Sequence, residues 1–321
     1  MEHSLFTIDH SLFTIHYSLF TIPHSPFFVS LPMTIHEARL QMINNLNSIY
    51  GDQEAMNITE LAIEYLTGKL KTEQVKNKEM IFPVDQIKKL NLVIEQLKQN
   101  EPIQYILGEA WFAGMKFHVD KTVLIPRPET EELVNWIIKT LMGWQLPKNR
   151  NYKILDIGTG SGCISIALRK QLPQFFETWA CDINDQVLTI ARKNADELHA
   201  LVDFIAMDFL DAAQRRQLPQ IDVIVSNPPY VPLRDKIAMN PNVVDFEPHT
   251  ALFVPDNDPL IFYRAIADFA KENLYAGGLV FVEIHEASGE KVTELFRQNG
   301  FSVELRKDMQ GKDRMLKCSY G

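Results

Sequence analysis

Apolar side chains recur at three- and four-residue steps between Thr34 and about Leu107, which is the spacing of one buried face of an α-helix. Such a stripe usually packs into a core, so we expect a small helical bundle with no chemistry of its own. The pattern predicts three helices: Ile35–Ile49 with a stop at Gly51, Asn57–Leu66 with a stop at Gly68, and Val84–Leu97.

The pattern changes between residues 108 and 150. Trp111–Val119 is typical of a short hairpin that turns at its glycine. Two prolines then predict an extended or turning path over Ile125–Thr130, followed by a helix over Glu131–Leu141. This segment can be a rigid linker or one wall of a site, because Arg127 would lie on a stiff loop beside the next domain.

Strands and helices alternate from Tyr152 onward, with helical patterns such as Gly162–Gln171 and Asp185–Leu198 between the earlier strands. Alternation of this kind indicates an α/β fold with a mostly parallel sheet covered on both faces. A short turn at Gly311 joins the last two strands, which predicts an antiparallel hairpin at one sheet edge. The predicted strands are Lys153–Ile157, Thr178–Ile183, Asp203–Met207, Asp222–Ser226, Leu279–Ile284, Ser302–Arg306 and Arg314–Cys318.

The chain has 321 residues, 46% of them hydrophobic, and this length suits about two globular domains. Its net charge of −9 argues against a protein that grips a nucleic-acid backbone over a broad surface, because such a surface needs clustered Lys and Arg. The three cysteines form no CxxC pair, so we expect neither a disulfide framework nor a zinc site. The apolar runs are shorter than a membrane helix requires, and we expect a cytoplasmic globular protein.

The pentapeptide Ser-Leu-Phe-Thr-Ile begins at Ser4, Ser11 and Ser18, a seven-residue period that is too short for stacked structural repeats. This segment has no Lys or Arg, and polar residues interrupt its apolar runs, so it does not fit a secretory signal. We interpret residues 1–32 as a low-complexity, disordered segment and expect translation to start at Met33.

A glycine-rich turn ends the first strand of the alternating region, with glycines at 158, 160 and 162. Glycines at alternate positions let the backbone approach a ligand closely. The GxGxG spacing differs from the dinucleotide pattern and from the Walker pattern with its lysine, and a tight strand-to-helix turn alone could explain it. Asp182 ends the next strand, where a carboxylate can accept hydrogen bonds from ribose hydroxyls, so the two features together favour a nucleoside ligand.

Asn227, Pro228, Pro229 and Tyr230 follow the fourth strand, at the sheet edge where open α/β proteins bind ligands. Two prolines remove two N–H groups and fix the chain, so exposed carbonyls and the Asn227 amide can point one way. Paired acceptors suit a planar –NH2 group, whose lone pair is delocalised. Holding both of its hydrogens, with an aromatic ring against its face, would raise the electron density on the nitrogen.

Four segments together carry a resemblance to a known family: Leu124–Glu129 (LIPRPE), Ile154–Gly160 (ILDIGTG), Val225–Tyr230 (VSNPPY) and Phe246–Leu252 (FEPHTAL). In this order they resemble the release factor glutamine methyltransferases, which are class I S-adenosylmethionine-dependent enzymes. The resemblance runs from about Thr34 to the C-terminus. It implies a Rossmann-like methyltransferase sheet over residues 151–321, a hairpin and linker over 108–150, and a helical substrate-recognition domain over 33–107.

The resemblance also implies residue roles. Asp182 would hold the cofactor ribose, and Asp208 and Phe209 would flank its adenine. Asn227 and the carbonyl of Pro228 would grip the substrate amide, with Pro229 and Tyr230 against it, and Asn227 would also face the cofactor. Arg127 and Glu247 belong to matching motifs, with roles left open. The residues that would line the methionine and adenosine part of the cofactor are Gly158, Thr159, Gly160, Ser161 and Gly162.

The implied reaction methylates the side-chain amide of the glutamine in the Gly-Gly-Gln loop of bacterial release factors, in support of translation termination. It implies no metal, no membrane and no direct nucleic-acid contact, and we expect a monomer. A ribosomal protein glutamine methyltransferase is an alternative, although the Ile-Pro-Arg-Pro-Glu segment favours the release factor. A DNA adenine methyltransferase is disfavoured by the net charge of −9. A non-catalytic scaffold on this fold is disfavoured by the intact glycine turn and Asn227.

Overall fold

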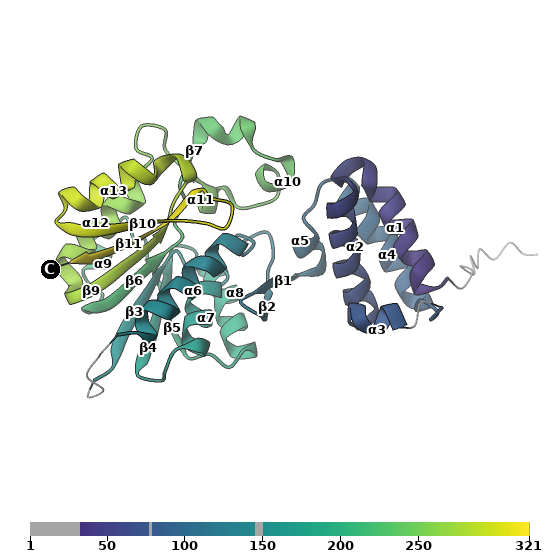
Figure 1. Ribbon diagram of the computed structural model, residues 1–321, viewed down its shortest axis with the longest axis horizontal. Helices are drawn as coiled ribbons and strands as arrows, with labels where there is room; N and C mark the ends of the chain where they lie inside the picture. Colours follow the sequence, from purple (N-terminus) through teal and green to yellow (C-terminus); the bar gives the residue numbers. More distant parts are fainter. Residues whose placement is uncertain (1–32, 77–78, 145–149, 321) are drawn as a thin grey trace, which may run out of the picture.

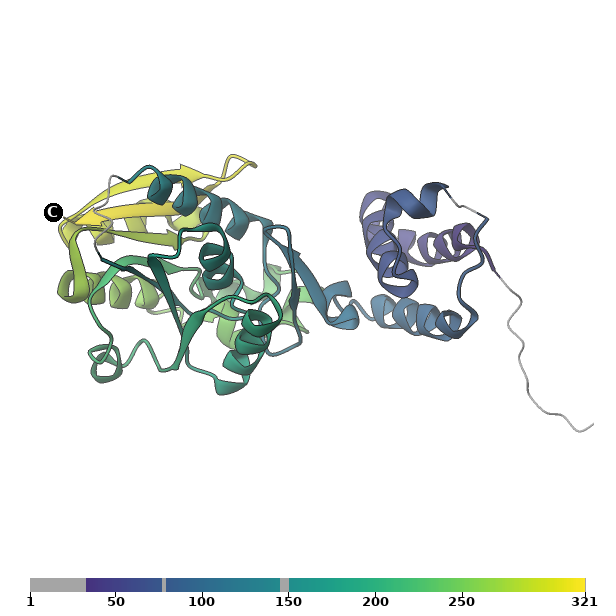
Figure 2. The same cartoon turned by 90° about the horizontal axis from the view of Figure 1, so that it is seen from below.

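The computed structural model describes residues 33–76, 79–144 and 150–320. Figures 1 and 2 show a helical domain that stands away from an α/β domain along the long axis of the molecule, joined to it through α5 and the hairpin that follows. The predictions made for residues 1–32 fall outside the described part of the chain. Within that part, no helix is long and apolar enough to cross a membrane.

Three longer helices build the helical domain around a core that includes Met42, Ile63 and Leu90. The predicted helices are confirmed, but α2 begins at Asp52 rather than Asn57, because Gly51 ends one helix and directly precedes the next. The shorter helices α3 and α5 have too few turns to leave an apolar period in the sequence. The helices are α1 (Ile35–Tyr50), α2 (Asp52–Thr67), α3 (Lys71–Lys76), α4 (Val84–Lys98) and α5 (Ile103–Leu107).

The predicted hairpin forms between β1 (Glu109–Phe112) and β2 (Met115–His118), which pair antiparallel. The next helix, α6 (Pro128–Met142), begins three residues before the predicted start at Glu131. The prediction was wrong there because proline is well tolerated in the first turn of a helix, where its missing N–H leaves no bond unmade. The earlier start places Thr130 in the first turn of α6, where it is buried.

Seven strands form one sheet in the order β10-β11-β9-β6-β3-β4-β5. The five strands from β9 to β5 in this order are parallel, and β10 and β11 form the predicted antiparallel hairpin at the opposite edge from β5. All seven predicted strands are thus confirmed, as is the α/β fold class. Their bounds are β3 (Tyr152–Ile157), β4 (Phe176–Asp182), β5 (Val202–Ala206), β6 (Ile221–Ser226), β9 (Leu274–Glu283), β10 (Phe301–Lys307) and β11 (Asp313–Tyr320).

Helices cover both faces of this sheet because its central strands are apolar on both sides. Ile224 of β6 packs into the core beneath α12 and α13, whereas its neighbours Val223 and Val225 pack into the core beneath α6 and α7. Besides α6, the helices of this domain include α7 (Cys163–Gln171), α8 (Asp185–Glu197), α9 (Ala212–Arg215), α12 (Ile261–Asn273) and α13 (Gly289–Gln298).

Short elements lie between β6 and α12 and make an excursion from the sheet, drawn green in Figure 1 at the end of the α/β domain nearest the helical domain. The excursion leaves directly from the Asn-Pro-Pro-Tyr segment, so it lies next to the candidate site. Its elements are β7 (Val231–Pro232), the 3-10 helix η1 (Leu233–Ala238), α10 (Pro241–Val244), α11 (His249–Leu252) and β8 (Phe253–Val254); a second 3-10 helix, η2 (Glu286–Ser288), follows β9.

Candidate functional site

The candidate site lies at the carboxyl ends of β3 and β6, where the order of the parallel strands reverses. The chain runs from β3 outward to β4 and β5, then returns to the opposite side of β3 to form β6. A reversal of this kind opens a crevice above the strand ends, which is where α/β proteins bind ligands. The two strands are in register at Ile157 and Ser226, and the Ser226 hydroxyl donates to the Ile157 carbonyl at 2.7 Å.

The glycine turn begins directly after β3 and exposes bare backbone. Gly158 and Gly160 have φ of 71° and 55°, and a Cβ added to either would meet no atom within 4 Å. Their missing side chains therefore leave open space for a ligand rather than room for a protein neighbour. Gly162 differs, since a Cβ there would lie 3.0 Å from Ile166 and 3.3 Å from Ala191, so it allows close packing of α8.

The side chains of Thr159 and Ser161 face the interior of the protein, and both residues are buried. The Thr159 hydroxyl donates to a carboxylate oxygen of Asp156 at 2.7 Å. The Ser161 carbonyl accepts a hydrogen bond from the side chain of Asn194 at 2.9 Å. The Thr159 side chain and the Ser161 carbonyl thus hold the turn in shape, and neither side chain of these two predicted cofactor residues points to the crevice.

Asp156 supports the turn from below. Its Oδ2 accepts from the Thr159 hydroxyl and from the Ser165 N–H, whereas its buried Oδ1 has no partner among the described residues. Burial raises the pKa of Asp156 to about 6, although the hydrogen bonds from Thr159 and Ser165 oppose the shift.

Asp182 ends β4 beside the same turn. Its Oδ2 accepts from the N–H of Gly160 at 3.1 Å, and its Oδ1 accepts from the N–H of Asn184 at 3.2 Å. Burial raises the pKa of Asp182, while these main-chain hydrogen bonds act in the opposite direction. The carboxylate is thus fixed at the turn, as expected for an acceptor of ribose hydroxyls.

One cavity of about 360 Å³ brings together six of the predicted site residues: Gly158, Asp182, Asp208, Phe209, Pro228 and Pro229. The Phe209 ring packs edge-on against the Phe269 ring, with centroids 5.4 Å apart. The cavity joins a carboxylate to mostly apolar walls, which suits a sugar attached to a planar base. Its other lining residues include Ile157, Ile183, Met207, Leu210, Phe253, Ile261 and Phe262.

Asn227 and Tyr230 direct their polar groups to another set of partners. The Nδ2 of Asn227 donates to the Thr130 hydroxyl at 3.1 Å. That hydroxyl in turn donates to the Oε2 of Glu283 at 2.7 Å. The Tyr230 hydroxyl donates to the Oε1 of Glu283 at 3.4 Å. Sequence reasoning missed Thr130 and Glu283, although a carboxylate that ends an otherwise apolar central strand is a signal that could have found Glu283.

Arg127 and Glu247, whose roles the sequence left open, form an ion pair. One Arg127 nitrogen, Nη2, donates to both carboxylate oxygens of Glu247, at 2.6 and 2.7 Å. Burial raises the pKa of Glu247 despite the adjacent guanidinium. The pair ties the loop before α6 to the excursion that follows the Asn-Pro-Pro-Tyr segment.

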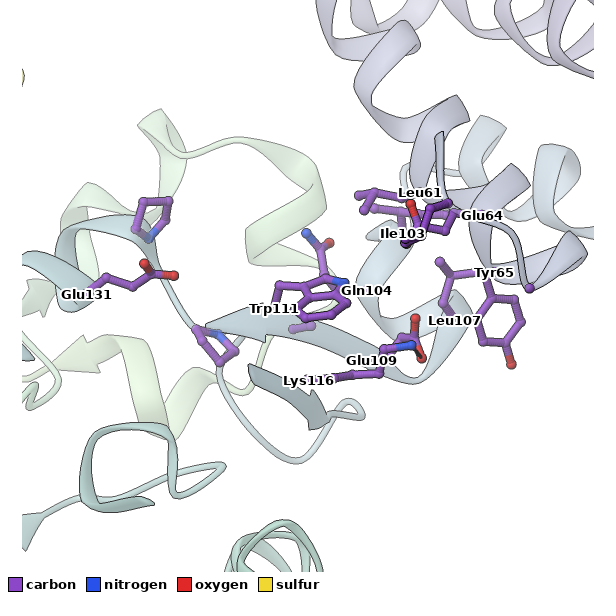
Figure 3. Close-up of a pocket in the computed structure, with 15 residues that line it drawn as sticks. Leu61, Glu64, Tyr65, Ile103, Gln104, Leu107, Glu109, Trp111, Lys116 and Glu131 are labelled. Carbon is purple, nitrogen blue, oxygen red and sulfur yellow. Dashed lines mark ion pairs between the residues drawn. The ribbon is translucent and has the colours of Figure 1, made fainter. Parts of the chain in front are cut away.

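A second cavity, of about 490 Å³, lies between the helical domain and the α/β domain. Figure 3 shows Leu61 and Tyr65 of α2 on one side and Trp111 of the hairpin on the other. Pro126 and Pro128, which flank Arg127, also line it. No pattern in the sequence indicated this cavity, because it forms only where the two domains meet.

Comparisons with known proteins identify the family of the chain. Residues 37–108 match the family model described as the PrmC N-terminal domain, and residues 139–245 match the methyltransferase small domain. The release factor glutamine methyltransferase of Flavobacterium psychrophilum is 40% identical over 90% of this chain and 100% of its own length. That of Bacteroides thetaiotaomicron is 43% identical, over 85% of this chain and 95% of its own. The chain belongs to the release factor glutamine methyltransferase family.

Membership of this family makes the chain an S-adenosylmethionine-dependent methyltransferase. The residues of the site fit that cofactor. Bare backbone at Gly158 and Gly160 leaves space at the strand end, Asp182 supplies a fixed acceptor, and the adjoining cavity has apolar walls around Phe209. We expect the cofactor to lie across this crevice, with its adenosine part in the cavity of about 360 Å³.

Replacement of Asp182 by alanine should weaken cofactor binding, because it removes both the ribose acceptor and the brace on the Gly160 N–H. We expect the dissociation constant of S-adenosylmethionine, measured by titration calorimetry, to rise at least tenfold, or about 1.4 kcal/mol. Asp211→Ala is the matched control, because that exposed carboxylate caps α9. Equal affinities of the wild type and Asp182→Ala would contradict this role.

Asp156 should make stability depend on pH. Its pKa rises from 3.8 to about 6 on folding, so its stabilising effect is complete below about pH 4 and is lost as the pH rises through 6. Relative to Asp156→Asn, the unfolding free energy of the wild type should fall by roughly 1 kcal/mol between pH 5 and pH 7.5. Urea denaturation of both proteins at the two pH values measures this, and a constant difference would refute it.

Proposed function

We propose that this enzyme transfers a methyl group from S-adenosylmethionine to the side-chain amide nitrogen of the glutamine in the Gly-Gly-Gln loop of bacterial release factors. The observation that carries the proposal is the Asn-Pro-Pro-Tyr segment at the switch point, where its two prolines line the cofactor cavity. The names of the curated relatives support it. The reaction would take place in the cytoplasm and support translation termination.

An amide nitrogen is a poor nucleophile because its lone pair is delocalised into the carbonyl group. S-adenosylmethionine, when bound, supplies a methyl group already activated on a sulfonium sulfur. The protein must therefore position the amide and stabilise the positive charge that develops on its nitrogen. Asn227 suits this task, since its Nδ2 is engaged by Thr130 and its Oδ1 remains to accept from the substrate –NH2 group. The carbonyl of Pro228 would be the second acceptor.

Tyr230 would form the wall beside these acceptors. Its hydroxyl donates to Glu283, and its ring lies edge-on to His285 with centroids 6.0 Å apart. Burial raises the pKa of Tyr230, so it stays neutral at physiological pH. An uncharged aromatic ring can lie against a planar amide, and we expect it to orient the substrate rather than exchange a proton.

Asn227→Ala should reduce kcat by about 100-fold or more, by analogy with the loss of one group that stabilises developing charge. The substrate is an unmodified release factor, and mass spectrometry measures the methyl group added to the Gly-Gly-Gln glutamine. Asn91→Ala, at an exposed position on α4, is the matched control. Near-normal turnover by Asn227→Ala would disprove the assignment. Methylation of a ribosomal protein instead of the release factor would favour the alternative substrate.

The helical domain and the second cavity suit recognition of the release factor outside its reacting loop. Tyr65 and Trp111 line this cavity, and 47% and 52% of their surface is exposed. Exposed aromatic side chains that line one cavity are typical of a surface that binds another protein. Glu64 and Glu131 add negative charge, and Glu109 pairs with Lys116 across the hairpin. We expect residues 33–107 and the hairpin to grip the substrate protein through this cavity.

Trp111→Ala should raise KM for the intact release factor about tenfold, because an exposed aromatic anchor is a typical hot spot of a protein interface. Its kcat on a short Gly-Gly-Gln peptide should stay unchanged, since the cavity lies outside the reacting site. Leu92→Ala, at a residue of α4 that is 63% exposed, serves as the control. An unchanged KM for the release factor would show that the substrate docks elsewhere.

A further inference from the structure

Three polar side chains meet beneath the Asn-Pro-Pro-Tyr segment, each from a different element. Thr130 comes from the first turn of α6, Asn227 from the end of β6 and Glu283 from the end of β9. Thr130 and Glu283 are 2% and 1% exposed, so neither is placed to contact a protein partner. Their hydrogen bonds, 3.1 Å from Asn227 to Thr130 and 2.7 Å from Thr130 to Glu283, form a continuous chain.

The chain of hydrogen bonds has a direction. An ionised carboxylate only accepts, so the single hydroxyl hydrogen of Thr130 is directed to Glu283. The oxygen of that hydroxyl can then only accept from Asn227, and it therefore selects the –NH2 end of the carboxamide. An asparagine side chain can otherwise turn by 180° and exchange its donor and acceptor ends. Turned that way, Asn227 would present hydrogens to the hydrogens of the substrate amide.

We infer that Thr130 and Glu283 are positioning residues that fix the carboxamide of Asn227 with its oxygen toward the substrate amide. The inference deepens the proposed function and rests on it. Neither residue touches the reacting atoms, and both act through Asn227. Glu283 also accepts from the Tyr230 hydroxyl, so one carboxylate orients both the acceptor and the aromatic wall of the site.

Burial opposes ionisation of Glu283 while its hydrogen bonds and a nearby cation favour it, so the carboxylate ionises near neutral pH. Burial raises its pKa to about 7, while the hydrogen bond from Thr130 and the charge of Arg314 on β11 lower it. Glu129, next to Thr130 on α6, acts to raise it, and Tyr230 donates a hydrogen bond that lowers it. From α12, the Tyr263 hydroxyl donates to the Glu283 main-chain carbonyl. Protonated Glu283 could instead donate to Thr130 and release the constraint on Asn227.

The decisive comparison uses Thr130→Val, which keeps the shape of the side chain without its hydroxyl, and Thr130→Ser, which keeps the hydroxyl. We expect kcat on the release factor to fall 10- to 100-fold in the valine variant and to recover to within about threefold of wild type in the serine variant. KM for the release factor and the dissociation constant of S-adenosylmethionine should stay within about twofold. Thr140→Val is the control, because that hydroxyl on the same helix only donates to the Trp136 carbonyl.

A double-mutant comparison separates positioning from general support of the fold. If Thr130 acts only through Asn227, adding Thr130→Val to Asn227→Ala should lower kcat no further, whereas independent effects would multiply. Glu283→Gln gives a second test: its kcat should be reduced, and the rise in wild-type kcat with an apparent pKa near 7 should be absent.

The outcomes distinguish this inference from the proposed function. A wild-type enzyme that leaves the release factor unmethylated would overturn both. A wild type that methylates it, together with a Thr130→Val variant of normal kcat, would overturn the positioning role alone. The positioning role would also be overturned if the losses of kcat in Thr130→Val and Asn227→Ala multiplied in the double variant. A Thr130→Ser variant with a kcat as low as that of Thr130→Val would overturn it as well. If Thr130→Val fails to fold, Glu283→Gln with wild-type kcat and an unchanged pH profile would overturn it instead.

Discussion

Pairing of β3 with β6 brings together two strand ends that lie 69 residues apart in the sequence, and a hydrogen bond from Ser226 to the Ile157 carbonyl fastens them. The glycine turn follows one end, and the Asn-Pro-Pro-Tyr segment follows the other. Without this pairing the site could not exist, since each segment supplies one half of it. The buried apolar faces of both strands make a shift of register costly, because it would move core side chains out of their packing.

Buried carboxylates shape the site around this junction. Asp156 lies beneath the glycine turn, Glu283 lies beneath Asn227 and Tyr230, and Glu247 holds Arg127. Burying a charge is unfavourable unless it is well hydrogen-bonded, and burial raises the pKa of all three. Apolar residues would fill the same space without the free-energy cost of desolvating a charge. The carboxylates instead impose donor and acceptor directions on neighbours that face the ligands.

The sequence revealed those parts of the molecule that depend on local patterns. Apolar runs predicted the seven strands, and the turn at Gly158 and the Asn-Pro-Pro-Tyr segment were visible as short motifs. The predicted start of α6 was wrong because Pro128 was interpreted as a residue outside the helix, although proline is well tolerated in the first turn. Thr130 and Glu283 lie 153 residues apart, and only the assembled sheet shows that they meet. The cavity between the domains likewise depends on long-range packing.

The segment from Pro126 to Thr130 connects the two halves of the proposed function. Pro126 and Pro128 line the cavity between the domains, Arg127 between them binds Glu247, and Thr130 bonds to Asn227. Two prolines and the first turn of α6 make this stretch stiff. If a partner fills the cavity as proposed, it contacts the same stiff segment that bonds to Asn227. Binding energy gained far from the chemistry can in this way reduce the cost of aligning the glutamine, which is how remote contacts raise turnover.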